Sequence, residues 1–90
     1  MPKLYELLGY QVSIWSFENG EPIHVHVSKR RPGTNSTKIW LLSDGSFELA
    51  HNASRISRND LNKIMRFLND SADEIRDFWI AYHGYEKYVR

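Results

Sequence analysis

Hydrophobic and polar residues alternate along the first half of the chain, which is typical of strands with one buried face. Strands are predicted at residues 10–17, 23–27, 38–42 and 47–49. Asn19-Gly20 and Asp44-Gly45 separate neighbouring strands, and these dipeptides favour hairpin turns because they tolerate positive φ. The pattern therefore predicts a three- to four-stranded, mainly antiparallel sheet within about residues 4–50.

In the second half of the chain, apolar residues recur with the period of an amphipathic helix. The first apolar stripe is formed by Leu61, Ile64, Met65 and Leu68. The second is formed by Ile75, Phe78, Trp79 and Tyr82. Ser57 and the capping box Ser71-Ala-Asp-Glu74 are predicted to cap the N-termini, and Gly84 is predicted to end the second helix. We therefore expect two C-terminal helices over about residues 57–83, followed by a short tail at 85–90.

Two helices with one apolar stripe each can cover only one face of a small sheet. The chain is therefore predicted to be a single α+β domain over residues 1–90, with both helices packed on one face. The covered face is predicted to contain Val12, Ile14, Ile23, Val25, Val27, Ile39 and Leu41. The opposite face is predicted to contain Ser13, Trp15, Phe17, His24, His26, Ser28, Lys38 and Trp40. We expect this second face to be exposed, and its tryptophan and histidine content is unusual for a surface that meets only water.

The amino-acid composition excludes several classes of protein. The 90 residues include no cysteine, so disulfides, thiolate metal sites and a thiol nucleophile are excluded. No run of apolar residues is long enough to span a membrane, and the first residues lack the apolar stretch of a signal peptide. We therefore expect a cytoplasmic protein that has no membrane partner and no cofactor.

The net charge of +1 is the sum of two regions of opposite charge. Residues 28–66 contain eight Lys and Arg against three acidic residues, whereas residues 67–86 contain one against five. The basic region offers a set of candidate nucleic-acid-binding residues: Lys29, Arg30, Arg31, Lys38, Arg58, Lys63 and Arg66. A solvated helix face and a surface for an acidic protein are the two alternatives for these residues.

The segment Glu21-Pro22-Ile23-His24-Val25-His26-Val27 resembles the signature of a family of small bacterial proteins described as a domain of unknown function. The resemblance covers roughly residues 5–84, and it includes Lys38-Ile39-Trp40-Leu41 and the aromatic residues 78–82. It implies no activity, but members are often encoded beside a second small protein in toxin–antitoxin-like pairs. The basic linker at residues 29–33 and the tail after Gly84 depart from the family pattern.

His24 and His26 are the main candidate site residues, because alternate residues of a strand point the same way with Cβ atoms about 7 Å apart. They can contact a partner protein together with Trp15 and Trp40. They can also act as a catalytic acid–base pair in a small ribonuclease, with a nearby lysine on the phosphate. A third, weaker role is metal binding, for which the additional ligands would come from His51, His83, Asp44 and Glu48.

We favour the first role, in which the protein is a non-enzymatic interaction protein and one component of a toxin–antitoxin-like pair. It would bind a protein partner, or a second copy of itself, through the exposed face that carries Trp15, His24, His26 and Trp40. The alternative is a ribonuclease or nucleic-acid-binding toxin that uses His24 and His26 with the basic residues. No metal site is assigned.

Overall fold

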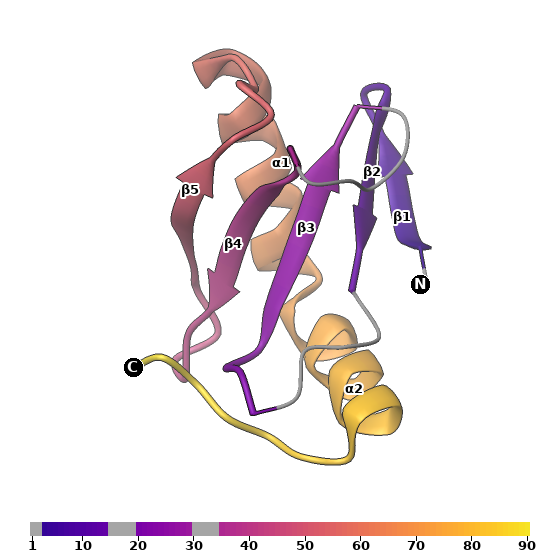
Figure 1. Ribbon diagram of the computed structural model, residues 1–90, viewed down its shortest axis with the longest axis vertical. Helices are drawn as coiled ribbons and strands as arrows, with labels where there is room; N and C mark the ends of the chain where they lie inside the picture. Colours follow the sequence, from indigo (N-terminus) through magenta and orange to yellow (C-terminus); the bar gives the residue numbers. More distant parts are fainter. Residues whose placement is uncertain (1–2, 15–19, 30–34) are drawn as a thin grey trace.

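The computed structural model describes residues 3–14, 20–29 and 35–90 of the chain. It contains one antiparallel sheet of five strands in meander order (Figure 1). The strands are β1 (Lys3–Leu7), β2 (Tyr10–Ser13), β3 (His24–Ser28), β4 (Thr37–Leu41) and β5 (Phe47–Asn52). Two helices follow, α1 (Arg58–Asp70) and α2 (Ala72–His83). The predicted α+β fold, with a sheet followed by two C-terminal helices, is confirmed.

Strand β1 is the element that the sequence pattern did not predict. It pairs antiparallel with β2 through a two-residue turn at Leu8-Gly9, so the sheet has five strands instead of three or four. Both turn residues have positive φ, 54° at Leu8 and 80° at Gly9. Such a turn usually has asparagine, aspartate or glycine at its first position, and the leucine there gives no turn signal.

One face of the sheet forms the hydrophobic core, as predicted. Val12 lies opposite Val27 in the β2–β3 pair, and Val25 lies opposite Ile39 in the β3–β4 pair. All seven residues predicted for this face are essentially inaccessible to solvent: Val12, Ile14, Ile23, Val25, Val27, Ile39 and Leu41. Helix α1 lies behind the sheet in Figure 1, and it adds the fully buried Ile64 and Leu68 to the same core.

The two helices follow each other almost without a linker. Helix α1 starts as predicted, because the Ser57 hydroxyl accepts a hydrogen bond of 3.2 Å from the Asp60 amide. Ser71 is both the C-cap residue of α1 and the N-cap residue of α2, but its side chain makes no capping hydrogen bond to α2. The predicted capping box is therefore wrong. Neither of these two helices is long and apolar enough to cross a membrane.

Helix α2 lies at the lower end of the sheet in Figure 1, and this position changes which of its residues are buried. Ala72, Ile75 and Trp79 face the core. Phe78 and Tyr82, which the sequence pattern placed on the buried stripe, are 44% and 47% exposed. That part of the prediction is wrong, because the end of the sheet is narrower than its face and covers a smaller arc of the helix.

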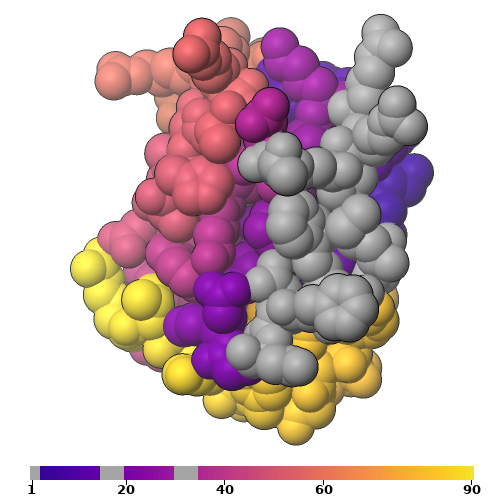
Figure 2. Space-filling view, in the orientation of Figure 1, coloured from indigo at the N-terminus to yellow at the C-terminus, as the bar shows by residue number. Residues whose placement is uncertain are grey.

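Residues 85–90 form an extended segment, the C-terminal strap, which runs across the lower end of the sheet (Figure 1; yellow in Figure 2). Gly84 ends α2 with φ 83°, as predicted, and turns the chain into the strap. The Ile23 amide donates to the Lys87 carbonyl at 2.8 Å, and the Ser43 amide donates to the Arg90 carbonyl at 3.0 Å. The expected short tail is therefore hydrogen-bonded to the sheet at both ends.

Candidate functional site

His24 and His26 lie on the same face of β3, as the alternation predicts, but this pair is not exposed. The exposed fraction is 0% for His24 and 6% for His26, so the predicted exposed histidine surface is wrong for both residues. Their ring centroids lie 5.0 Å apart, and the His24 ring lies 5.4 Å from that of Trp40. Trp15, the fourth residue of the predicted partner surface, lies outside the described residues.

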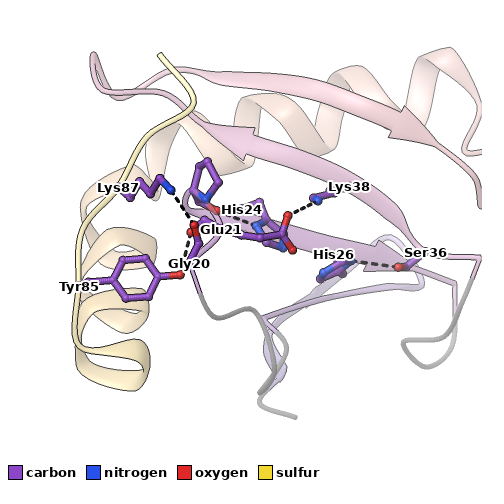
Figure 3. A network of polar contacts seen from close by, with 9 residues as sticks. Gly20, Glu21, His24, His26, Ser36, Lys38, Tyr85 and Lys87 are labelled. Atoms are coloured by element: carbon purple, nitrogen blue, oxygen red, sulfur yellow. Dashed lines mark hydrogen bonds and ion pairs between the residues drawn. The ribbon is translucent and has the colours of Figure 1, made fainter.

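Two hydrogen bonds hold the imidazole rings (Figure 3). His24 Nδ1 lies 2.8 Å from the Pro22 carbonyl, and because a carbonyl only accepts, this nitrogen carries the proton. His26 Nδ1 pairs with the Ser36 hydroxyl at 3.1 Å. Burial, followed by the charges of His24 and Lys38, lowers the pKa of His26 to about 3. His26 is therefore neutral near pH 7. A histidine that transfers protons needs a pKa close to the working pH, and the pKa of His26 lies well below it. Catalysis by this pair stays a prediction without support from the geometry.

Trp79 of α2 packs against His24, which together with His26 forms the histidine cluster of β3. Its ring centroid lies 5.2 Å from that of His24 and 4.1 Å from that of His83, one helical turn away. The indole nitrogen is fully buried and has no hydrogen-bond partner within the part of the chain that the structure describes. An unsatisfied donor of this kind costs on the order of 1–3 kcal/mol, so ring packing must offset its burial.

The residues proposed as further metal ligands do not complete a ligand set with His24 and His26. His51 lies opposite Lys38 in the β4–β5 pair, and His83 packs against Trp79. Glu48 forms an ion pair with Arg90 of the strap, and Asp44 accepts hydrogen bonds from Ser46 that lower the pKa of its carboxyl. Across residues 3–14, 20–29 and 35–90, no three His, Asp or Glu side chains are placed to share a metal ion. The weaker metal-binding alternative therefore finds no ligand set in the described structure.

The predicted nucleic-acid-binding residues separate into two groups. Lys38 lies on the histidine face, where its amine is 2.9 Å from the Glu21 carboxylate (Figure 3). The same amine is 4.4 Å from the Trp40 ring centroid. On the other side of the sheet, α1 exposes Arg58, Lys63 and Arg66. Lys29 is exposed after β3, and Arg30 and Arg31 lie outside the described residues. The structure therefore does not join Lys38 and the α1 cations into one patch.

A groove between α2 and the first hairpin is the feature that the sequence analysis missed. It is an open cavity of about 250 Å³, lined by Lys3, Leu4, Ile14, Phe78, Ala81 and Tyr82. Ile14 is buried, whereas Phe78 and Tyr82 are nearly half exposed. We call it the α2 groove. The signal that could have revealed it is the apolar stripe of α2, which is wider than the end of a small sheet can cover.

One acidic residue of α2, Glu74, lies beside the apolar side chains that α2 contributes to the groove. Asp73, Glu74 and Asp77 are all exposed, but at about 100° per residue only Glu74 lies on the same side of the helix as Phe78. Asp73 is 2.7 Å from the Arg76 guanidinium, and Glu74 accepts a hydrogen bond from the Tyr5 hydroxyl of β1. Burial, together with Glu74, raises the pKa of Tyr5 to about 12. The α2 groove therefore combines a mainly apolar lining with one carboxylate, Glu74, on its α2 side and one cation, Lys3, on its β1 side.

Comparison with known proteins gives one match. A family model described as "Domain of unknown function (DUF4160)" matches residues 9–80, which extend from the start of β2 almost to the end of α2. No curated protein and no solved structure matches the chain. The matched segment contains the histidine cluster of β3 and leaves out β1 and the C-terminal strap.

Proposed function

The chain belongs to the family described as a domain of unknown function (DUF4160), and for this member we propose an interaction protein that binds a second protein through the α2 groove. The main observation that supports this proposal is the exposure of Phe78 and Tyr82 beside Leu4 in that groove. Aromatic side chains are enriched at the centres of protein interfaces, where they act as anchors. We extend the proposal to a toxin–antitoxin-like pair, in line with the family resemblance of the sequence.

The shape of the groove favours a protein over a small molecule. Small-molecule pockets typically enclose about 300–1,000 Å³ and bury most of the ligand surface. The α2 groove is smaller, open along one side, and lined almost entirely by apolar side chains. Such a surface suits one or two apolar side chains that project from a partner segment.

The charge at the border of the groove defines the partner further. Glu74 places a negative charge beside Phe78, one helical turn away on the same side of α2. A partner segment with apolar anchors and a lysine or arginine opposite Glu74 is complementary to this arrangement, and charge complementarity speeds association and selects partners. An amphipathic helix with a basic polar side combines both properties.

The proposal is tested by calorimetric titration with a synthetic amphipathic helical peptide that carries leucine anchors and lysines beside them. Phe78→Ala/Tyr82→Ala removes both anchors, and we expect it to weaken binding by more than about tenfold. Leu49→Ala is the matched control, since Leu49 is an exposed apolar residue on β5, outside the groove. Unchanged binding by the double variant, or equal weakening by the control, would contradict the proposal.

Sedimentation of the chain alone tests whether the groove binds a second copy instead. We expect the wild-type chain and Phe78→Ala/Tyr82→Ala to sediment identically as monomers. A wild-type dimer that the double variant converts into a monomer would identify a second copy as the occupant, and it would overturn the two-protein proposal. Thermal unfolding of both chains shows that any difference arises from the surface and not from loss of the fold.

A further inference from the structure

The outward side of α1 carries cations and amides along most of its length. Its exposed residues are Arg58, Asn59, Asn62, Lys63, Arg66 and Asn69, with Asp70 at the C-terminal end. Asp60, the acidic residue of the first turn, is directed inward, and its carboxylate accepts a hydrogen bond of 2.8 Å from the Tyr10 hydroxyl. The remaining surface of the helix is therefore positively charged.

The cations of this surface differ from other cations in the described structure. Lys38, Arg76 and Arg90 form ion pairs with nearby carboxylates. In the described part of the chain, no carboxylate lies within ion-pair distance of Arg58, Lys63 or Arg66. These three charges are available to an external anion.

The angular order of the side chains matches that of a helix in the DNA major groove. At about 100° per residue, Asn62, Arg66 and Asn59 fall within an arc of about 60°. Arg58 and Lys63 flank this arc on either side, about 140° apart. A helix in the major groove directs central side chains to base edges and flanking cations to the phosphates. Asparagine pairs with adenine and arginine with guanine in this groove.

Two features of this region are unfavourable for folding, as is common for residues at binding sites. Three of the 13 residues of α1 are asparagines, although asparagine is a weak helix former. Arg55, in the turn before α1, has φ 56°, a conformation that glycine or asparagine adopts with less strain. Asn52 holds this turn, because its side chain bonds both the amide and the carbonyl of Ile56. Local strain of this kind clusters at functional sites.

We propose that α1 binds duplex DNA in the major groove, using Arg55, Arg58, Asn59, Asn62, Lys63 and Arg66. Duplex DNA fits better than single-stranded RNA, because sites for unpaired bases present aromatic side chains for stacking and this surface has none. The deep, narrow major groove of an RNA duplex excludes the helix. This site is separate from the α2 groove and goes beyond the proposed function.

The test is fluorescence anisotropy with a labelled, mixed-sequence DNA duplex of about 20 base pairs, a length that spans about two helical turns. We expect binding that weakens from about 50 to about 200 mM salt, because phosphate contacts release counterions. Arg58→Gln/Lys63→Gln removes the two flanking cations, so it should weaken binding by more than about tenfold and reduce the salt slope by about 1.8, since each phosphate contact contributes about 0.9. Arg76→Gln/Lys87→Gln removes the same charge elsewhere and should bind like the wild type.

Arg55→Asn separates binding from folding. This variant relieves the positive φ, so we expect its melting temperature to rise while its affinity for the duplex falls by about threefold, the loss of one phosphate contact. Three results would overturn the proposal: no duplex binding at about 50 mM salt, equal weakening by the two double variants, or tighter binding of single-stranded RNA of the same length. The Phe78→Ala/Tyr82→Ala variant should bind the duplex normally, so this proposal and that for the α2 groove can fail independently.

Discussion

The Tyr10 hydroxyl donates a hydrogen bond of 2.8 Å to the Asp60 carboxylate and so joins β2 to the first turn of α1. The Tyr10 ring is buried in the core, and burial, followed by the nearby Asp60, raises the pKa of its hydroxyl. The bond fixes the N-terminal end of α1 relative to the sheet, and it also directs the Asp60 carboxylate inward. This contact therefore stabilises the packing of α1 on the sheet, and it also keeps the Asp60 carboxylate away from the positively charged outer side of the helix.

Tyr10→Phe tests the structural part of this contact. We expect the free energy of unfolding to fall by about 1–2 kcal/mol, because the hydrogen bond is lost and the partly buried Asp60 carboxylate loses its donor. Tyr88→Phe is the control, since Tyr88 bonds the exposed Glu86 and should cost much less. Urea denaturation measures both values. Equal stability of wild type and Tyr10→Phe would show that the bond contributes nothing.

The low pKa of His26 predicts a dependence of stability on pH. Between pH 6.5 and about 3, the unfolded chain binds a proton at this residue and the folded chain does not. The free energy of unfolding should therefore decrease as the pH falls through this range, by about 1 kcal/mol per pH unit from this group. Other groups also titrate here, so the quantity to compare is the slope of the wild type against that of His26→Asn.

His51→Asn is the control for that comparison, because His51 is exposed on β5. We expect His51→Asn to keep the wild-type slope between pH 6 and pH 4 and His26→Asn to flatten it. A wild-type slope in His26→Asn would mean that His26 titrates in the folded chain as it does in water. The buried position of β3 in the fold would then need revision.

The positive φ of Leu8 predicts a stabilising substitution. Asparagine is favoured over leucine at the first position of a two-residue hairpin turn whose residues have positive φ. Because Leu8 is exposed, its replacement loses little burial, and Leu8→Asn should raise the free energy of unfolding by about 1 kcal/mol. Leu49→Asn makes the same chemical change within β5 and should not stabilise the fold. Differential scanning calorimetry distinguishes these results.

The C-terminal strap predicts a local change in amide exchange. The Tyr85 hydroxyl donates to the Glu21 carbonyl at 2.8 Å, next to the bond between the Ile23 amide and the Lys87 carbonyl. Tyr85→Phe should cost about 1 kcal/mol and speed hydrogen exchange at the Ile23 amide more than at amides within β2. Val89→Ala, in the exposed part of the strap, should leave exchange at Ile23 unchanged. Uniform acceleration across the sheet would instead indicate global destabilisation.

The sequence predicted the composition of the core better than the exposure of the second face. The alternation along β3 assigned Val25 and Val27 to one side and His24 and His26 to the other, because a strand has a side-chain period of two. It could not reveal that Trp79 of α2 reaches the His24 ring, since that contact depends on how α2 docks at the end of the sheet. Exposure is a property of tertiary packing that one strand does not encode.

The same reason explains the missed groove and the missed strand. The stripe on α2 was correctly recognised as apolar, but its pattern alone could not show that Phe78 lies beyond the edge of the sheet. Strand β1 was missed because Leu8 occupies a turn position that is usually held by asparagine or glycine. In both cases the position of a residue, Phe78 or Leu8, differs from the one that the local sequence pattern predicts. The difference is visible only in the three-dimensional structure.

The α2 groove is built on both sides of the boundary of the family match. Ile14 and Phe78 lie within the matched segment, whereas four lining residues lie outside it: Lys3, Leu4, Ala81 and Tyr82. Substitutions at these four positions can reshape the groove while leaving the matched sheet and α1 intact. Under the proposed function, partner choice would therefore depend on residues outside the segment that defines the family, so that two chains with this segment need not recognise the same protein.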